Sequence, residues 1–170
     1  MKTKQLSHEN TQIEPNTFHL VLVCDGITSP ANAGGLMRLS DALGIYHVYF
    51  CNSKINFESS RFKRTARSTE MYVPYTQTLD TQALLENLVA TNYKLIGLEL
   101  TNTSLPLTAY KTGENTKIAL VLGNERNGIS QEVLDKLNDT VFIPMHGKNS
   151  SMNVAQAAAI AAYNLINNAL

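Results

Sequence analysis

The stretch FHLVLVCDGITSPANAGGLMRLSDALGIYHVYFC, residues 18–51, decides the fold class of this chain. It opens with a short apolar run rich in β-branched and aromatic residues, which predicts a buried strand over residues 18–24. Apolar residues then recur at helical spacing between Pro30, a residue favoured in the first turn of a helix, and Gly44, a residue typical of helix ends. Another apolar run predicts a second strand over residues 46–51. A strand, a helix and a strand in this order are typical of an α/β fold.

The alternation of strand and helix continues to the C-terminus. Further extended segments are expected over residues 71–75, 94–100, 117–123 and 141–145, and further helices over residues 81–91, 129–137 and 151–170. The strands are almost continuously apolar, as expected when helices cover both faces of a sheet. We therefore predict one α/β domain over residues 18–170, with a mostly parallel sheet and helices on both faces, after a flexible tail over residues 1–17.

Composition excludes several classes of protein. Of the 170 residues, 44% are hydrophobic and 16% are charged, which is typical of a globular domain and not of a disordered chain. No apolar run approaches the length of about 18 residues that a membrane-spanning helix needs, and the N-terminus lacks the apolar core of a secretory signal. Cys24 and Cys51 lie in apolar strands, where buried free thiols are expected. These features predict a cytoplasmic protein without a membrane contact or a disulfide.

Charge is distributed unevenly along the chain, although the 14 basic and 14 acidic residues cancel. Nucleic-acid-binding proteins often carry a positive excess, because phosphate contacts supply much of their affinity. Between residues 54 and 70 basic residues outnumber acidic ones by five to two. The basic residues are Lys54, Arg61, Lys63, Arg64 and Arg67. A solvated, flexible loop and a surface for nucleic-acid phosphates both fit this segment.

Three loops have unusual sequences: PANAGGLMR over residues 30–38, LGNERNGIS over residues 122–130 and IPMHGKNSSMNVA over residues 143–155. Each follows a predicted strand. In open α/β sheets, ligands bind in loops beyond the carboxyl ends of the strands. These loops are therefore the candidate functional segments.

Common ligand motifs do not explain the three loops. Gly123 and Gly128 have the spacing of a phosphate-binding P-loop, but Ile129 follows where that motif needs a lysine. No G-x-G-x-x-G and no G-x-S-x-G follows a strand, and the four histidines are scattered along the chain. A dinucleotide site, a serine-hydrolase elbow and a metal site are therefore unsupported.

Taken together and in order, the three loops resemble the three motifs of the SpoU (TrmH-type) RNA methyltransferases of the SPOUT class. The first is matched by Asn32, Gly34 and Arg38, the second by Gly123, Asn124, Glu125 and Gly128, and the third by Ile143, Pro144, Met145, Gly147, Ser151, Asn153, Val154 and Ala155. Met152 stands where the family usually has leucine, a volume-conserving exchange. The resemblance runs from about residue 18 to the C-terminus.

The resemblance implies transfer of a methyl group from S-adenosylmethionine to a ribose 2′-hydroxyl of a structured tRNA or rRNA. It also implies a C-terminal trefoil knot and a homodimer, with RNA as the partner and neither DNA nor a membrane. A catalytically degenerate SPOUT domain that only binds RNA is the alternative, and intact motif residues argue against it. The extra N-terminal RNA-binding domain of many relatives is not expected, which leaves the choice of RNA open.

A site for this cofactor needs apolar walls and backbone groups for the adenine, because the molecule carries no phosphate. Glycine in such a site lets the backbone approach the ligand closely. The cofactor-binding residues that the resemblance implies are Leu98, Leu122, Gly123, Asn124, Ile143, Met145, Ser151 and Met152.

The catalytic residues that the resemblance implies are Arg38, Asn32, Glu125, Ser151 and Asn153, with no metal. In the family proposal Arg38 assists deprotonation of the ribose hydroxyl. A guanidinium has a pKa above about 12, so holding a phosphate and stabilising the alkoxide is an equally defensible role. We expect Glu125 and Asn153 to fix Arg38 and the loops, and Ser151 has a second interpretation as the N-cap of the last helix. Arg61, Lys63, Arg64 and Arg67 are then expected to contact RNA phosphates.

Overall fold

The computed structural model describes residue 3, residues 18–113 and residues 116–168, so nearly all of the predicted tail over residues 1–17 lies outside the described part. The strands are β1 Leu20–Asp25, β2 His47–Cys51, β3 Tyr75–Thr78, β4 Tyr93–Leu98, β5 Leu105–Pro106, β6 Lys117–Leu122 and β7 Asp139–Phe142. The helices are α1 Pro30–Leu43, α2 Ser60–Ala66, α3 Thr81–Ala90, α4 Gln131–Leu134 and α5 Val154–Asn167, with 3-10 turns η2 at Thr69–Met71 and η3 at Leu107–Ala109.

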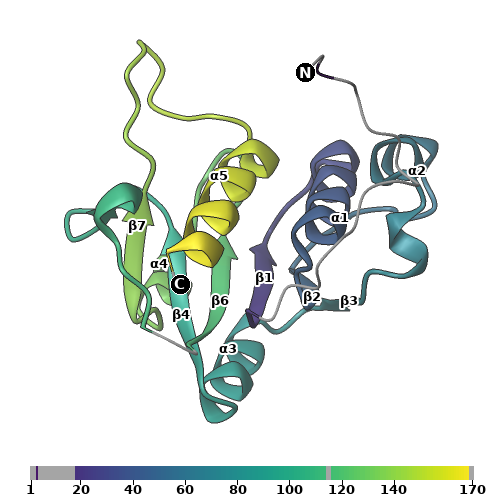
Figure 1. Ribbon diagram of the computed structural model, residues 1–170. Helices are drawn as coiled ribbons and strands as arrows, with labels where there is room; N and C mark the ends of the chain where they lie inside the picture. Colours follow the sequence, from purple (N-terminus) through teal and green to yellow (C-terminus); the bar gives the residue numbers. More distant parts are fainter. Residues whose placement is uncertain (1–2, 4–17, 114–115, 169–170) are drawn as a thin grey trace.

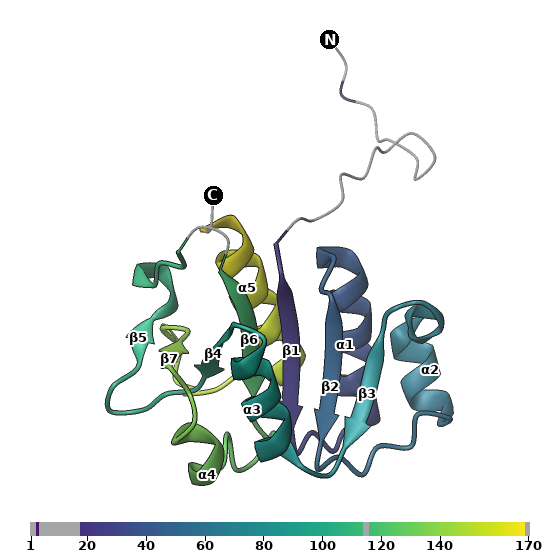
Figure 2. The same cartoon turned by 90° about the horizontal axis from the view of Figure 1, so that it is seen from below.

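The seven strands form one parallel sheet in the order β3-β2-β1-β6-β4-β7-β5 (Figures 1 and 2, with β5 labelled in Figure 2). The first three strands run outward in the order β1, β2, β3. Strand β6 then pairs with β1 on its other side. Such a reversal of strand order places loops of both halves at one edge of the sheet. The predicted parallel α/β architecture is confirmed, whereas the trefoil knot stays a prediction.

Helices cover both faces of the sheet, and alternate residues of a strand serve the two sides (Figure 2). Leu20 and Leu22 of β1 pack into a core shared with α1, α2 and α5. Val21 and Val23 point the other way, into a second core with α3 and α4. This arrangement explains why the strands are apolar at successive positions.

Helix α1 begins and ends where the sequence signals predict. Ser29 is the N-cap, and its hydroxyl accepts a hydrogen bond of 3.3 Å from the backbone N–H of Asn32. Pro30 occupies the first turn, where its missing N–H costs nothing. Gly44 ends the helix in the left-handed conformation, with φ at 62°.

Gly34 allows α1 and α2 to pack closely. A Cβ atom at this position would lie 2.7 Å from the carbonyl oxygen of Phe62 and 2.9 Å from the backbone nitrogen of Ala66, both in α2. Phe62 and Ala66 are themselves buried in the core beneath. The glycine of the first motif therefore has a packing role away from the cavity described below.

Three sequence expectations about local structure were wrong. Residues 60–66 form the helix α2 where a flexible loop was one interpretation. The segment expected to be extended, residues 71–75, joins the sheet only at Tyr75, because Met71 still belongs to the turn η2. The last helix begins at Val154 and not near residue 151, because the Asn153 side chain caps it by accepting a hydrogen bond of 2.9 Å from Ala155 N–H. The N-cap of α5 is therefore Asn153 and not Ser151.

Both cysteines are buried free thiols, as expected, at the ends of the neighbouring strands β1 and β2. Burial raises the pKa of Cys24 well above its ordinary value and, as the largest cause, raises that of Cys51 to about 12. The protonated thiol is a poor nucleophile, so neither residue has the environment of a reactive cysteine. None of the described helices is long and apolar enough to cross a membrane.

Candidate functional site

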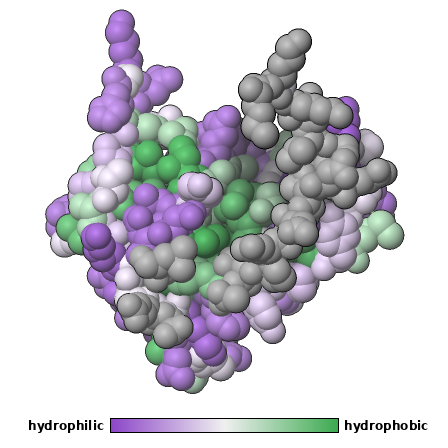
Figure 3. Space-filling view, in the orientation of Figure 1, coloured by the Kyte–Doolittle hydropathy of each residue, from purple (hydrophilic) through white to green (hydrophobic). Residues whose placement is uncertain are grey.

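A cavity of about 840 Å³ lies at the carboxyl ends of β4, β6 and β7. Leu98, Leu122 and Phe142, the last residues of these strands, form part of its floor. The two loops of residues 123–130 and 143–153 line its sides. The second loop projects from the body of the protein, and apolar surface lies at its base (Figures 1 and 3).

Every residue expected to bind the cofactor lines this cavity. Leu98, Leu122, Gly123, Asn124, Ile143, Met145, Ser151 and Met152 come together there from segments far apart in the sequence. Asn32, Glu125 and Asn153 also line it. Four lining residues outside the three loops were missed by sequence reasoning: Glu99, Leu100, Phe142 and Ala157. Their position in the chain could have identified them, because each lies at a strand end or in the first turns of α5.

The second motif forms a tight loop that folds back on itself. Asn124 and Gly128 exchange two backbone hydrogen bonds of 2.9 Å each. A Cβ atom at Gly123 would lie 2.1 Å from the carbonyl carbon of Gly128, so only glycine fits there. Asn124 Nδ2 also donates a hydrogen bond of 2.6 Å to the carbonyl oxygen of Gly26, which fixes the loop against the end of β1.

Glu125 connects the second motif to the start of α1. Its carboxylate accepts hydrogen bonds from the backbone N–H groups of Thr28 and Ser29 at 3.2 and 3.1 Å, and from Asn32 Nδ2 at 2.9 Å. Partial burial by itself would raise the pKa of Glu125, but the hydrogen bonds from Asn32, Thr28 and Ser29 outweigh it and the pKa is lowered. A carboxylate at a helix N-terminus is also favoured by the helix dipole. These contacts thus favour the ionised form of Glu125.

Asn32 joins all three motifs. Its Nδ2 donates to Glu125 of the second motif, and its Oδ1 accepts a hydrogen bond of 2.8 Å from Asn153 Nδ2 of the third. Asn153 at the same time caps α5 with its own oxygen. One continuous chain of hydrogen bonds, from Glu125 through Asn32 to Asn153, therefore fixes the cavity wall.

Glu99 holds the second motif from the other side. Its Oε2 accepts a hydrogen bond of 3.1 Å from Ile129 N–H, and its Oε1 accepts one of 3.0 Å from Leu100 N–H. A Cβ atom at Gly128 would lie 2.4 Å from Glu99 Oε2. Two carboxylates, Glu99 and Glu125, thus anchor the same short loop.

Arg38 lies apart from these contacts. Its side chain is exposed on α1, does not line the cavity, and makes no hydrogen bond or ion pair with the residues that the structure describes. Glu125 and Asn153, which we expected to fix Arg38, bond to Asn32. Ser151 is exposed at the cavity.

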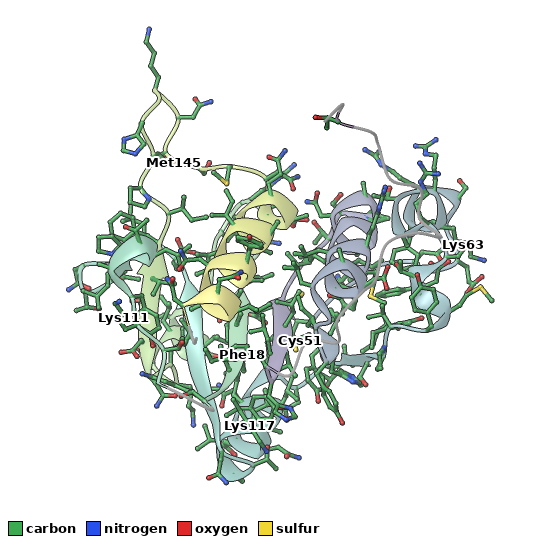
Figure 4. All side chains as sticks on the ribbon, viewed as in Figure 1. Phe18, Cys51, Lys63, Lys111, Lys117 and Met145 are labelled. Atoms are coloured by element: carbon green, nitrogen blue, oxygen red, sulfur yellow. The ribbon has the colours of Figure 1, made fainter. Side chains whose placement is uncertain are left out.

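The basic residues of α2 are all exposed, while Phe62 and Ala66 form its buried face. Lys63 pairs with Glu58 at 2.5 Å (Figure 4 labels Lys63). Arg61, Arg64 and Arg67 form no ion pair within the described residues. The described part of the chain also contains no cluster of His, Cys, Asp and Glu that could hold a metal ion.

Known proteins share this sequence and architecture. Residues 19–163 match the model of the SpoU rRNA Methylase family. The 23S rRNA (guanosine(2553)-2'-O)-methyltransferase RlmP of Bacillus subtilis (strain 168) is 29% identical over 149 residues, which are 88% of this chain and 58% of the relative. The chain therefore spans less than two thirds of that relative.

Solved structures extend the comparison. One described as "Structural insights into the 2-OH methylation of C/U34 on tRNA" is 27% identical with a TM-score of 0.77, and the match covers 89% of this chain and 96% of that one. The AdoMet-bound rRNA methyltransferase from Sinorhizobium meliloti has a TM-score of 0.82 over 93% of this chain and 59% of its own, and at 21% identity it shows the fold alone. Because the family match covers most of the chain, this protein belongs to the SpoU rRNA methylase family.

Proposed function

We propose that this chain transfers a methyl group from S-adenosylmethionine to a ribose 2′-hydroxyl of a structured RNA. The observation that carries the proposal is the hydrogen-bonded chain from Glu125 through Asn32 to Asn153, which joins the three motifs beside a partly apolar cavity. The family membership and the names of the relatives support this activity, and they give no support to a degenerate domain that only binds RNA.

The cavity fits the proposed cofactor. Its volume of about 840 Å³ lies within the range of small-molecule sites. Leu98, Leu122, Ile143, Met145 and Met152 would enclose the adenosine and the methionine chain, and no phosphate has to be accommodated. When bound, S-adenosylmethionine supplies an activated methyl group. Membership of the SpoU rRNA methylase family supports this assignment.

Arg38 is the residue that we assign to the ribose. A 2′-hydroxyl becomes a good nucleophile only when its proton is drawn away. A guanidinium remains protonated in proteins, so we assign Arg38 to holding the neighbouring phosphate and to stabilising the negative charge that develops on the ribose oxygen. Asn32, Glu125 and Asn153 act as positioning residues that keep the loops in place. Ser151, exposed at the cavity, stays a candidate for contact with either ligand.

RNA is the proposed partner, and a homodimer is the proposed assembly. Arg61, Arg64 and Arg67 offer exposed guanidinium groups for backbone phosphates. Helix α5 leaves apolar side chains uncovered, with Ile160 45% exposed and Tyr163 62% exposed. A second copy packed on this face would bury them, which supports a dimer through α5. The proposal places this dimer in the cytoplasm, as a single methyltransferase domain from residue 18 onward.

The proposal is tested in two steps. Titration calorimetry should show saturable binding of S-adenosylmethionine without added metal, by a protein that light scattering shows to be larger than the 18.7 kDa monomer. Transfer of a radioactive methyl group to unfractionated tRNA or rRNA, followed by nucleoside mass spectrometry, should then yield 2′-O-methylated nucleosides. A folded dimer that binds no cofactor would overturn the assignment.

A further inference from the structure

The charged residues that line the cavity form no ion pairs with one another. Four charged residues line it: Glu99, Glu125, Arg126 and Lys148. Both carboxylates accept hydrogen bonds from uncharged donors of the protein, mostly backbone N–H groups and, for Glu125, the Asn32 amide. Neither carboxylate forms an ion pair with a described residue. The side chains of Arg126 and Lys148 likewise form no ion pair with a described residue, so both are available to a bound anion.

Arg126 and Lys148 reach the cavity from different loops. Arg126 is exposed in the second motif, where its backbone N–H donates a hydrogen bond of 2.9 Å to Asn124 Oδ1 and so fixes the base of the side chain. Lys148 is exposed in the projecting loop, next to Gly147, which has open space around it. The loop rises from the base that Met145 marks in Figure 4. The two cations thus come to one cavity from two different loops.

The proposed cofactor cannot account for both cations. Its single carboxylate is accompanied by an ammonium and a sulfonium group, so the molecule as a whole is cationic. A phosphodiester backbone carries one negative charge per nucleotide, and arginine and lysine are the side chains that bind it. Charge complementarity therefore favours RNA as the partner of the free cations.

We propose that Arg126 and Lys148 form a clamp that holds the RNA backbone at the nucleotide entering the cavity. This inference rests on the proposed function, and it adds two positioning residues that the three motifs do not name. The clamp is separate from the exposed arginines of α2, because its members line the cavity and those of α2 do not. Its contacts carry no base information, so they position the ribose and leave the choice of sequence to other residues.

The clamp is tested with the full chain and the variants Arg126→Gln, Lys148→Gln and the double variant. Lys111→Gln is the matched control, because Lys111 is also exposed but does not line the cavity. Binding of a fluorescent single-stranded oligouridylate is measured over a range of salt concentrations, and binding of S-adenosylmethionine is measured by calorimetry. Each lost phosphate contact should reduce the slope of log affinity against log salt by about 0.7, which is about fivefold in affinity for each tenfold fall in salt.

The expected result is a reduced slope in both single variants, an additive reduction in the double variant, and a wild-type slope in Lys111→Gln. Affinity for S-adenosylmethionine should stay unchanged in all of them. If the variants instead lose cofactor affinity and keep the slope, the cations bind the methionine carboxylate and the proposal is wrong. Unchanged values for both ligands would also overturn it. A wild-type protein that binds neither ligand would contradict the proposed function itself.

Discussion

Asn153 Nδ2 donates a hydrogen bond of 2.8 Å to Asn32 Oδ1, across 121 residues of sequence. The other end of the same Asn32 amide donates to Glu125 Oε1 at 2.9 Å. The carboxylate can only accept, so it requires the nitrogen of Asn32 on its side, and the oxygen is left for Asn153. Asparagine at position 32 is therefore specified by its two neighbours, because aspartate has no donor for Glu125.

The first prediction concerns the requirement for asparagine at position 32. Asn32→Asp should lower the free energy of unfolding by about 1–3 kcal/mol, because a carboxylate would face Glu125 and two hydrogen bonds would be disturbed. Urea denaturation measures the effect. Asn56→Asp is the matched control, since the Asn56 oxygen only accepts a hydrogen bond, from Glu58 N–H, and an aspartate preserves it. If both variants were equally stable, the hydrogen bonds at position 32 would not distinguish asparagine from aspartate.

The second prediction concerns pH. The pKa of Glu125 is lowered in the folded protein relative to its ordinary value of 4.5, so its ionised form stabilises the fold above that pH. This contribution is lost as the pH falls below 4.5 and through the folded-state pKa. Glu125→Gln should therefore show a shallower loss of unfolding free energy over this acidic range than the wild type. Parallel pH profiles of the two proteins, from urea titrations, would contradict the stabilising role of the ionised carboxylate.

The third prediction separates Gly34 from its neighbour Gly35. Gly34→Ala should destabilise the protein by about 1–3 kcal/mol, because the new methyl group meets backbone atoms of Phe62 and Ala66 that cannot rotate away. Gly35→Ala gains the same helix propensity, about 1 kcal/mol, and its methyl group meets only the Cβ of Ala155 at 3.3 Å. The free energy of unfolding of Gly35→Ala should stay near that of the wild type, because the tight contact with Ala155 offsets the gain in helix propensity. Thermal unfolding compares the two, and a larger loss in Gly35→Ala would reverse this interpretation.

The sequence predicts the sheet and the cavity well, because both depend on local patterns. Apolar runs mark the strands, Pro30 and Gly44 mark the ends of α1, and strand ends mark the cavity. The helix α2 was harder, since it is only seven residues long and its buried face rests on Phe62 and Ala66. A periodic pattern needs more turns than this to stand out from a basic loop.

The partners of the site residues could not be predicted from their spacing. Asn32, Glu125 and Asn153 each have a local interpretation, as a cap or a solvated side chain, and only the sheet order brings them together. Likewise, the ion pair of Lys63 depends on Glu58, a residue five positions earlier that belongs to no motif. Side-chain pairing is a property of the fold, and the spacing of residues in a single sequence does not reveal it.

The fourth prediction concerns the cations of α2. Arg61→Gln and Arg64→Gln should each weaken RNA binding and flatten its dependence on salt, because both guanidinium groups are free to contact phosphates. Lys63→Gln should have a smaller effect, since its ammonium already pairs with Glu58. Fluorescence anisotropy with unfractionated tRNA at several salt concentrations measures the three variants. An equal or larger effect at Lys63 would mean that the pair opens when RNA binds.

The fifth prediction concerns Arg38. Arg38→Ala should abolish methyl transfer to RNA and leave S-adenosylmethionine binding nearly intact, because Arg38 does not line the cavity. Its exposed side chain has no partner in the described part of the chain, so the free energy of unfolding should change by no more than about 0.5 kcal/mol. Methyl transfer, calorimetry and urea denaturation on one preparation separate the three effects.

Arg38→Lys tests whether Arg38 acts through its positive charge alone or through the geometry of its guanidinium group. Lysine keeps the positive charge but loses the planar group that binds a phosphate through two parallel hydrogen bonds. If the guanidinium geometry matters, this variant should remain far below the wild type in methyl transfer while it binds RNA with a similar dependence on salt. Activity close to the wild type in Arg38→Lys would mean that a point charge is enough. Activity close to the wild type in Arg38→Ala would remove Arg38 from the chemistry altogether, because that variant has neither the charge nor the geometry.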